Sequence, residues 1–262
     1  MSKHLLVPAF VISLSAFAIQ HSPLTQTAAA TTLSLHLLGH RIGQERSDVT
    51  SGADGGVLRS HFEYLDRGTT VALDSTLTYS ADLTPVSFES HGKSYRYFSV
   101  DVSVPAGARP PAAKSGAAPN SFMLEGVAPL SAQALLVRYW LAHGTPGSIS
   151  ILPSGDAVSV RESALTVVTD AGLPPLRQFT IDGVSWGRQR LWLRRDTLEL
   201  VAAVSSVGVL GFEAVPPPFE PAAATFARAA THARLEEAAT ESAAVPPMHR
   251  GTFADAAPID IR

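Results

Sequence analysis

Apolar and polar residues alternate along most of the chain from Thr31 to about Val215, with the two-residue period of half-buried β-strands. The signal is clearest around residues 66–68, Asp-Arg-Gly, because these turn residues separate alternating runs over 57–64 and 69–79. Two such runs joined by a short turn predict a β-hairpin with one solvated face.

The same kind of run recurs through the rest of this region. A second turn is expected at residues 91–93, His-Gly-Lys, between runs over 85–90 and 94–104. Further runs follow residue 147, and the total comes to about ten to twelve strands. The pattern therefore predicts a mainly β fold, with a curved antiparallel sheet or an incomplete β-barrel.

One segment inside the β region has a helical period. Residues 131–143 space their large apolar side chains as a helix does, with Ser131 placed to cap the start and Gly144 to end the helix. We expect this helix to pack on the concave side of the sheet.

Composition divides the chain into four parts. Residues 1–30 are expected to be a signal peptide and leader, and residues 31–215 a β-rich domain that contains a Pro/Ala/Gly-rich loop at 105–119. Residues 216–245 predict a Pro-rich turn and an Ala-rich helix, lying outside the sheet or loosely docked. Residues 246–262 have no periodicity, and we expect an unstructured tail.

The N-terminus fits a cleavable secretory signal. Lys3 and His4 precede an apolar run over residues 5–18, which is too short to span a hydrocarbon core of about 30 Å. Small residues at 16–18 and at 28–30 offer two cleavage sites, and an uncleaved membrane anchor is the alternative. We therefore expect a periplasmic or secreted protein with no stable transmembrane segment after cleavage.

Composition narrows the chemistry further. The chain has no cysteine, which excludes thiolate nucleophiles, Cys-zinc sites, iron–sulfur clusters and a lipoprotein anchor. The formal net charge is −3, with acidic and basic residues interspersed, so we expect no basic face for nucleic acid or anionic lipid.

No catalytic motif is evident. The chain lacks a Gly-x-Ser-x-Gly elbow, a His-x-His pair and a phosphate-binding Gly-x-x-x-x-Gly-Lys loop. His36, His40, His61 and His91 lie on expected strands and could in principle form a metal site, but their neighbours are polar. We interpret them as solvated strand residues and expect neither a catalytic residue, a metal site nor a cofactor.

Aromatic residues are the remaining candidate for a binding site. Tyr139 and Trp140 on the expected helix, with Phe98, Phe122 and Trp192 on strands, could line an apolar pocket for a lipid or another hydrophobic ligand. The alternative is that these side chains only fill the core. Of the five, Phe98, Tyr139, Trp140 and Trp192 are the predicted ligand-binding residues.

Several stretches together carry a resemblance to a known family. The order HRIGQE, FEYLDRG, a strand–linker–helix passage, LWLRRDTLELVAAVSSVGVLGFEAV and PPMHRGTF is similar to the N-terminal β extension of secreted bacterial amidohydrolases. It also resembles periplasmic proteins with a curved sheet like that of the lipoprotein carrier. The resemblance covers most of residues 31–253 and implies a following metal-dependent hydrolase barrel. Residues 254–262, ADAAPIDIR, do not continue into it, so no metal ligand of that family can be assigned here.

Two functions remain open. The first is a non-catalytic accessory or hydrophobic-ligand-holding domain of the cell envelope, with a lipid or a hydrolase domain as its partner. The second is the N-terminal part of an amidohydrolase whose catalytic domain is absent from this chain. The coding sequence downstream of residue 262 would discriminate between them.

Overall fold

The computed structural model describes residues 26–27, 30–108, 120–126, 128–164, 172–184, 188–206 and 211–244. The expected signal peptide therefore lies almost wholly outside the described residues. The same holds for most of the Pro/Ala/Gly-rich loop and for the expected tail.

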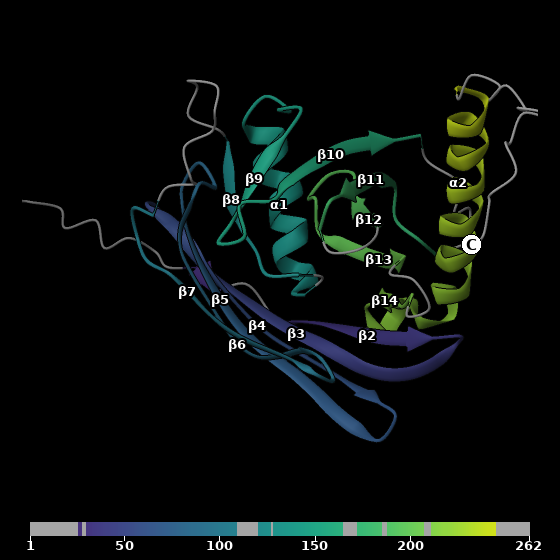
Figure 1. Ribbon diagram of the computed structural model, residues 1–262, viewed down its shortest axis with the longest axis horizontal. Helices are drawn as coiled ribbons and strands as arrows, with labels where there is room; N and C mark the ends of the chain where they lie inside the picture. The colour runs from purple at the N-terminus through teal and green to yellow at the C-terminus, as the bar shows by residue number, and fades with distance from the viewer. Residues whose placement is uncertain are drawn as a thin grey trace, which may run out of the picture.

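The described chain forms a single long sheet that curls into a nearly closed barrel, as Figure 1 shows. Its first half consists of β2 (Thr31–Leu37), β3 (His40–Gly52), β4 (Gly55–Asp66), β5 (Thr69–Ser80), β6 (Pro85–Tyr95) and β7 (Phe98–Val104). Its second half consists of β8 (Ser121–Met123), β9 (Ile149–Leu152), β10 (Ala157–Ser163), β11 (Leu176–Asp182), β12 (Arg188–Arg194), β13 (Leu200–Ser206) and β14 (Glu213–Val215).

The strand order is β7-β6-β5-β4-β3-β2-β14-β13-β12-β11-β10-β9-β8, and β1 (Gln26–Thr27) pairs with β3 beside this path. Every pairing is antiparallel except that of β8 with β9. The predicted mainly β class and the curved antiparallel sheet are confirmed. The described residues form 14 strands, more than the ten to twelve expected. Residues 31–50 read as a single run in the sequence but form the two strands β2 and β3, and β1 and β14 are too short to show a period.

The turn expected at residues 91–93 is wrong. His91 and Gly92 lie inside β6, where they pair with Asp74 and Leu73, and the chain turns only after Tyr95. Gly92 serves close packing instead, because a Cβ there would lie 2.2 Å from the backbone oxygen of Ala72.

Helix α1 (Leu130–Ala142) lies on the concave side of the sheet, as expected (Figure 1). It is buried around most of its circumference, which is why its sequence is apolar on all sides. Its end follows the prediction, since Gly144 has a φ of 75° just beyond the helix. Its start does not, because the helix has no side-chain cap of its own and Ser131 lies within the first turn.

Two further helical segments lie at the C-terminal side: the short 3₁₀ helix η1 (Pro217–Ala222) and α2 (Ala223–Ala244). Helix α2 packs on the outer face of β13 and β14, away from α1 (Figure 1). Trp192 of β12 is fully buried beneath it, with its ring centroid 5.1 Å from that of Phe226. The second helix is thus outside the sheet, as expected, and it covers a core of its own.

Ion pairs also join α2 to the sheet. Glu237 of α2 pairs with Arg188 and with the fully buried Arg190, and its Oε1 accepts a hydrogen bond of 2.8 Å from Arg161. Burial opposes ionisation of Glu237, but the hydrogen bond from Arg188 and the charge of Arg190 hold its pKa below the usual value. In the part of the chain described, no helix combines the length and apolarity that a membrane span requires.

Candidate ligand-binding cleft

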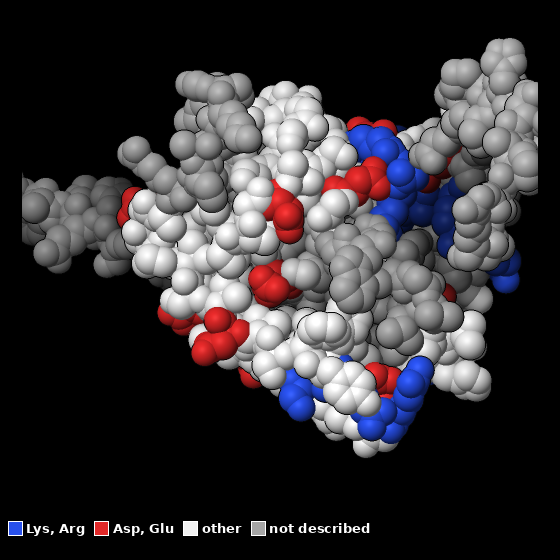
Figure 2. All heavy atoms as spheres, viewed as in Figure 1, with Lys and Arg blue, Asp and Glu red and all other residues white. Residues whose placement is uncertain are grey.

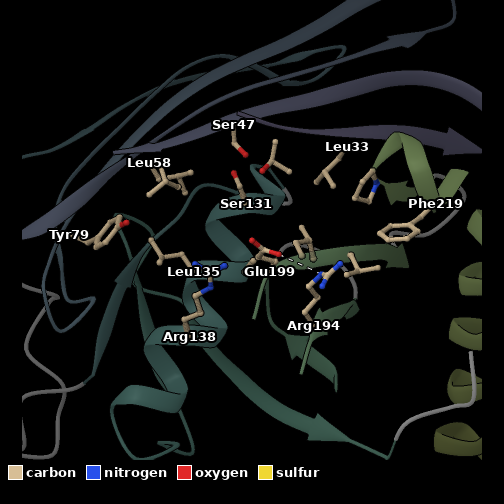
Figure 3. A pocket seen from close by; sticks show the side chains of 16 residues that line it. Leu33, Ser47, Leu58, Tyr79, Ser131, Leu135, Arg138, Arg194, Glu199 and Phe219 are labelled. Carbon is tan, nitrogen blue, oxygen red and sulfur yellow. Dashed lines mark ion pairs between the residues drawn. The ribbon is translucent and has the colours of Figure 1, made fainter. Parts of the chain in front are cut away.

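A cleft of about 300 Å³ separates α1 from the sheet, and a second cavity of about 630 Å³ shares seven of its lining residues and extends toward the β3–β4 and β5–β6 turns. Figure 3 shows Leu33, Ser47 and Leu58 of the sheet on one side and α1 on the other. The space remains because α1 crosses the curved sheet and does not fill the whole of its concave side.

The walls of the cleft combine apolar side chains with polar and charged ones. Leu33, Leu58 and Leu135 are buried, and Val49 and Leu200 are half-buried. The lining residues of β2, Thr31 and Leu33, and of β3, Ser47 and Val49, come from alternate positions, so the period of these strands also supplies the wall. Such a surface suits an apolar chain, because filling it removes apolar area from water on both sides.

Arg138 brings a positive charge into the cleft from α1. It is the one Lys or Arg of α1, and its Nε and Nη2 donate hydrogen bonds of 3.1 and 2.8 Å to the carbonyl oxygen of Leu198. These bonds fix the side chain, while burial lowers its pKa below the usual value, partly offset by Tyr79 and Glu199. An anionic group placed here would relieve the unfavourable burial of the guanidinium charge.

An ion pair lies at another side of the cleft. Arg194 Nε lies 3.6 Å from Glu199 Oε2, and Figure 3 shows this pair facing the helix. Both groups are partly exposed, so their contribution to stability is small. Arg194 is thus held by a carboxylate, whereas Arg138 is held by a backbone carbonyl oxygen.

The position of α1 over the sheet depends on one buried carboxylate. Glu45 of β3 accepts hydrogen bonds from the backbone nitrogens of Leu130 and Ser131, at 2.6 and 2.8 Å, and so caps the helix from another strand. Burial raises the pKa of Glu45, although these hydrogen bonds act in the opposite direction. Ser47, two positions after Glu45 on the same face of β3, lines the cleft. The cap of α1 and one wall of the cleft therefore belong to the same strand.

None of the four predicted ligand-binding residues lines this cleft. Tyr139 and Trp140 are buried in the main core, and Trp192 is buried under α2. Phe98 is 54% exposed at the start of β7. The structure brings Tyr139 and Trp140 together on α1 but separates them from the other two, and their role in binding stays a prediction.

The histidines fall into two groups. His36 is buried, contrary to expectation, and it pairs with Glu213 of β14 and Arg41 of β3. His40 is exposed, while His61 and His91 each bond through Nδ1 to a carboxylate, Asp74 at 2.7 Å and Asp101 at 2.8 Å respectively. No three His, Asp or Glu side chains among the described residues are arranged to hold a metal ion.

Sequence reasoning missed Arg138, although a signal was present. It is the only charged residue in an otherwise apolar helical segment that was expected to face the sheet. Glu45 and Ser47 carried no comparable signal, since a polar residue on a strand is ordinarily assigned to the solvent face.

The comparisons with known proteins provide no assignment for this cleft. No model of a known protein family matches the chain, and a search of curated proteins found no match to its sequence.

Proposed function

We propose that this protein is an exported, non-catalytic module of the cell envelope that holds an amphiphile in the cleft between α1 and the sheet. The apolar chain lies along Leu33, Leu58 and Leu135, and the anionic head reaches the guanidinium of Arg138. The observation that carries the proposal is the half-buried guanidinium of Arg138, fixed by its bonds to Leu198, beside the apolar side chains of Leu33, Leu58 and Leu135.

Export is supported by the pattern of residues 1–18, with its cationic start and short apolar run. A non-catalytic role is supported by the sequence, which has no Gly-x-Ser-x-Gly elbow and no His-x-His pair. The carboxylate of the cleft, Glu199, forms an ion pair with Arg194. The ligand class follows from charge and shape: a long apolar part with one acidic end group.

Binding of a fluorescent long-chain fatty acid is the direct test. The wild-type chain should bind it, and Ser47→Phe should abolish binding because the added ring occupies the cleft. Ser103→Phe is the matched control, since Ser103 is exposed on the outer face of β7 and should leave binding unchanged. Native mass spectrometry of protein from an envelope fraction should show the bound ligand. Equal binding by wild type and Ser47→Phe would refute the site.

Arg138→Gln tests the head-group contact separately. Loss of a charge-assisted hydrogen bond, worth about 1.5–3 kcal/mol, should weaken the fatty acid about 10- to 100-fold. Affinity for the matching fatty alcohol should change little, because it carries no charge. If both ligands weaken equally, Arg138 acts only through its bonds to Leu198.

A further inference from the structure

Large apolar side chains are exposed at three hairpin turns. Among the described residues, the exposed large apolar side chains are Leu38, Leu65, Tyr97, Phe98 and Leu235, and all but Leu235 lie at the β2–β3, β4–β5 and β6–β7 turns. These four are between 54% and 87% exposed. Clustered exposed apolar residues commonly mark a surface that meets another body.

The fold brings the three turns to one end of the sheet. In the order β7-β6-β5-β4-β3-β2, antiparallel pairing places alternate turns at the same end. A small apolar cavity of about 40 Å³ confirms their closeness, because Leu37, Tyr64 and Tyr95 of the three hairpins all line it. The Tyr64 hydroxyl also donates a hydrogen bond of 3.4 Å to the carbonyl oxygen of Ser94.

Positive charge is concentrated around these apolar residues. The turn segments 37–42, 64–69 and 93–98 contain four Lys or Arg residues against the single carboxylate of Asp66, a net charge of +3 in a chain whose net charge is −3. Figure 2 shows Lys and Arg along the lower edge of the molecule, where these hairpins end in Figure 1. We call this the hairpin-tip surface, made of Leu38, Arg41, Leu65, Arg67, Lys93, Arg96, Tyr97 and Phe98.

The opposite end of the same strands has the reverse character. Its turns, residues 52–55 and 81–84, carry two carboxylates and no cation. Neither turn has an exposed large apolar residue. The difference between the ends of one sheet is therefore one of both charge and hydrophobicity.

We propose that the hairpin-tip surface docks on an anionic lipid surface, a role distinct from ligand holding in the cleft. Short apolar and aromatic side chains protrude separately from turns, with cations between them, which suits insertion among lipid head groups. The guanidinium of Arg96 lies over the Tyr97 ring, 5.3 Å from its centroid, so the charge and the amphipathic ring reach the surface together. A flat protein partner would instead favour a continuous apolar patch with charge at its rim.

A single fluorophore tests this docking directly. The chain has no cysteine, so Ser99→Cys accepts one environment-sensitive label beside Phe98 without removing any side chain of the surface. The label should shift to the blue on vesicles of mixed phosphatidylglycerol and phosphatidylcholine. Ala53→Cys, exposed on a turn at the opposite end, is the matched control and should not shift.

Charge sets the expected magnitudes. Each unit of positive charge near an anionic surface strengthens binding about fivefold, so Arg96→Gln in the labelled chain should weaken binding about fivefold. Vesicles of phosphatidylcholine alone lack the attraction for the whole net charge of +3, so they should bind about a hundredfold more weakly. Tyr97→Ser should weaken binding to both kinds of vesicle. Three results would overturn the proposal: no shift on anionic vesicles, an equal shift of the Ala53→Cys label, or a shift that grows with protein concentration without vesicles. The last would show that a second copy of the chain covers these turns.

Discussion

Glu45 offers the sharpest test of how the cleft is built. Its carboxylate accepts hydrogen bonds from the backbone nitrogens of Leu130 and Ser131, and α1 has no other side-chain cap. Replacing Glu45 with Ala leaves the nitrogen of Leu130 buried without an acceptor and that of Ser131 half-buried. A buried donor without a partner costs about 1–3 kcal/mol. We therefore expect Glu45→Ala to lower the free energy of unfolding by about 2–4 kcal/mol.

One effect opposes this loss. Burial raises the pKa of Glu45, so the wild type bears the unfavourable burial of a charge that Ala does not carry. The backbone nitrogens of Leu130 and Ser131 keep their places in Glu45→Ala, so we expect the cost of leaving them without an acceptor to exceed this gain. Glu45→Gln keeps one carbonyl acceptor and no charge, and it should fall between the other two.

The pH dependence separates the two contributions. Because the folded pKa of Glu45 is raised, the stability that protonation provides is complete below the ordinary value of 4.5 and is lost as the pH rises through the folded value. The wild type should therefore gain stability relative to Glu45→Gln as the pH falls toward 4.5. Urea unfolding followed by far-UV circular dichroism measures both quantities, and Glu89→Ala, an exposed position on β6, is the control. A loss below about 0.5 kcal/mol for Glu45→Ala, the range of ordinary surface substitutions, would refute the capping role.

Three further predictions concern residues on the outer side of the sheet. Trp192→Ala should lower the free energy of unfolding by about 3–5 kcal/mol in urea titrations, because the indole is fully buried under α2. Glu237→Gln should destabilise by about 3 kcal/mol, since it leaves the buried Arg190 without its counter-charge; limited proteolysis should then cut α2 first, whereas Glu236→Gln should not have this effect. The hydrogen bond with Asp74 raises the pKa of His61, so its stabilisation is present below the ordinary pKa and lost as the pH rises through the folded value; NMR titration of the ring should show this shift, and Asp74→Asn should reduce it while Glu63 keeps a smaller part.

Local patterns predicted the parts of the fold that local forces determine. The hairpin around residues 66–68 is confirmed because Gly68, with a φ of 80°, supplies the left-handed conformation that the turn requires. Helix α1 was also evident, since its period differs from that of every flanking run. Each signal is contained within one continuous stretch, residues 57–79 for the hairpin and 130–142 for the helix, where sequence spacing and spatial neighbours coincide.

Features that depend on distant strands were not readable in the same way. Gly92 carries the same local signal whether it turns the chain or lets two strands approach, and only the pairing with β5 decides between them. Glu45 lies 85 residues from the helix nitrogen that it caps. The cations of the hairpin-tip surface are interspersed along the chain with acidic residues, and for that reason we expected no basic face; three separate turns bring them together.

The cleft and the hairpin-tip surface lie toward opposite ends of the same strands, which leads to a last prediction. The cavity that continues the cleft is lined by Gly52, Gly55 and Ser80, at the acidic end, whereas the lipid-facing turns follow β2, β4 and β6 at the other. A chain docked by its tips would therefore direct the mouth of the cleft away from the lipid surface. Because the two sites share no residue, vesicle binding and fatty-acid binding should be independent: Tyr97→Ser should leave fatty-acid affinity unchanged, and Ser47→Phe should leave vesicle binding unchanged. A change of more than about threefold in either affinity, about 0.6 kcal/mol, would refute this independence and show that the two sites are energetically coupled.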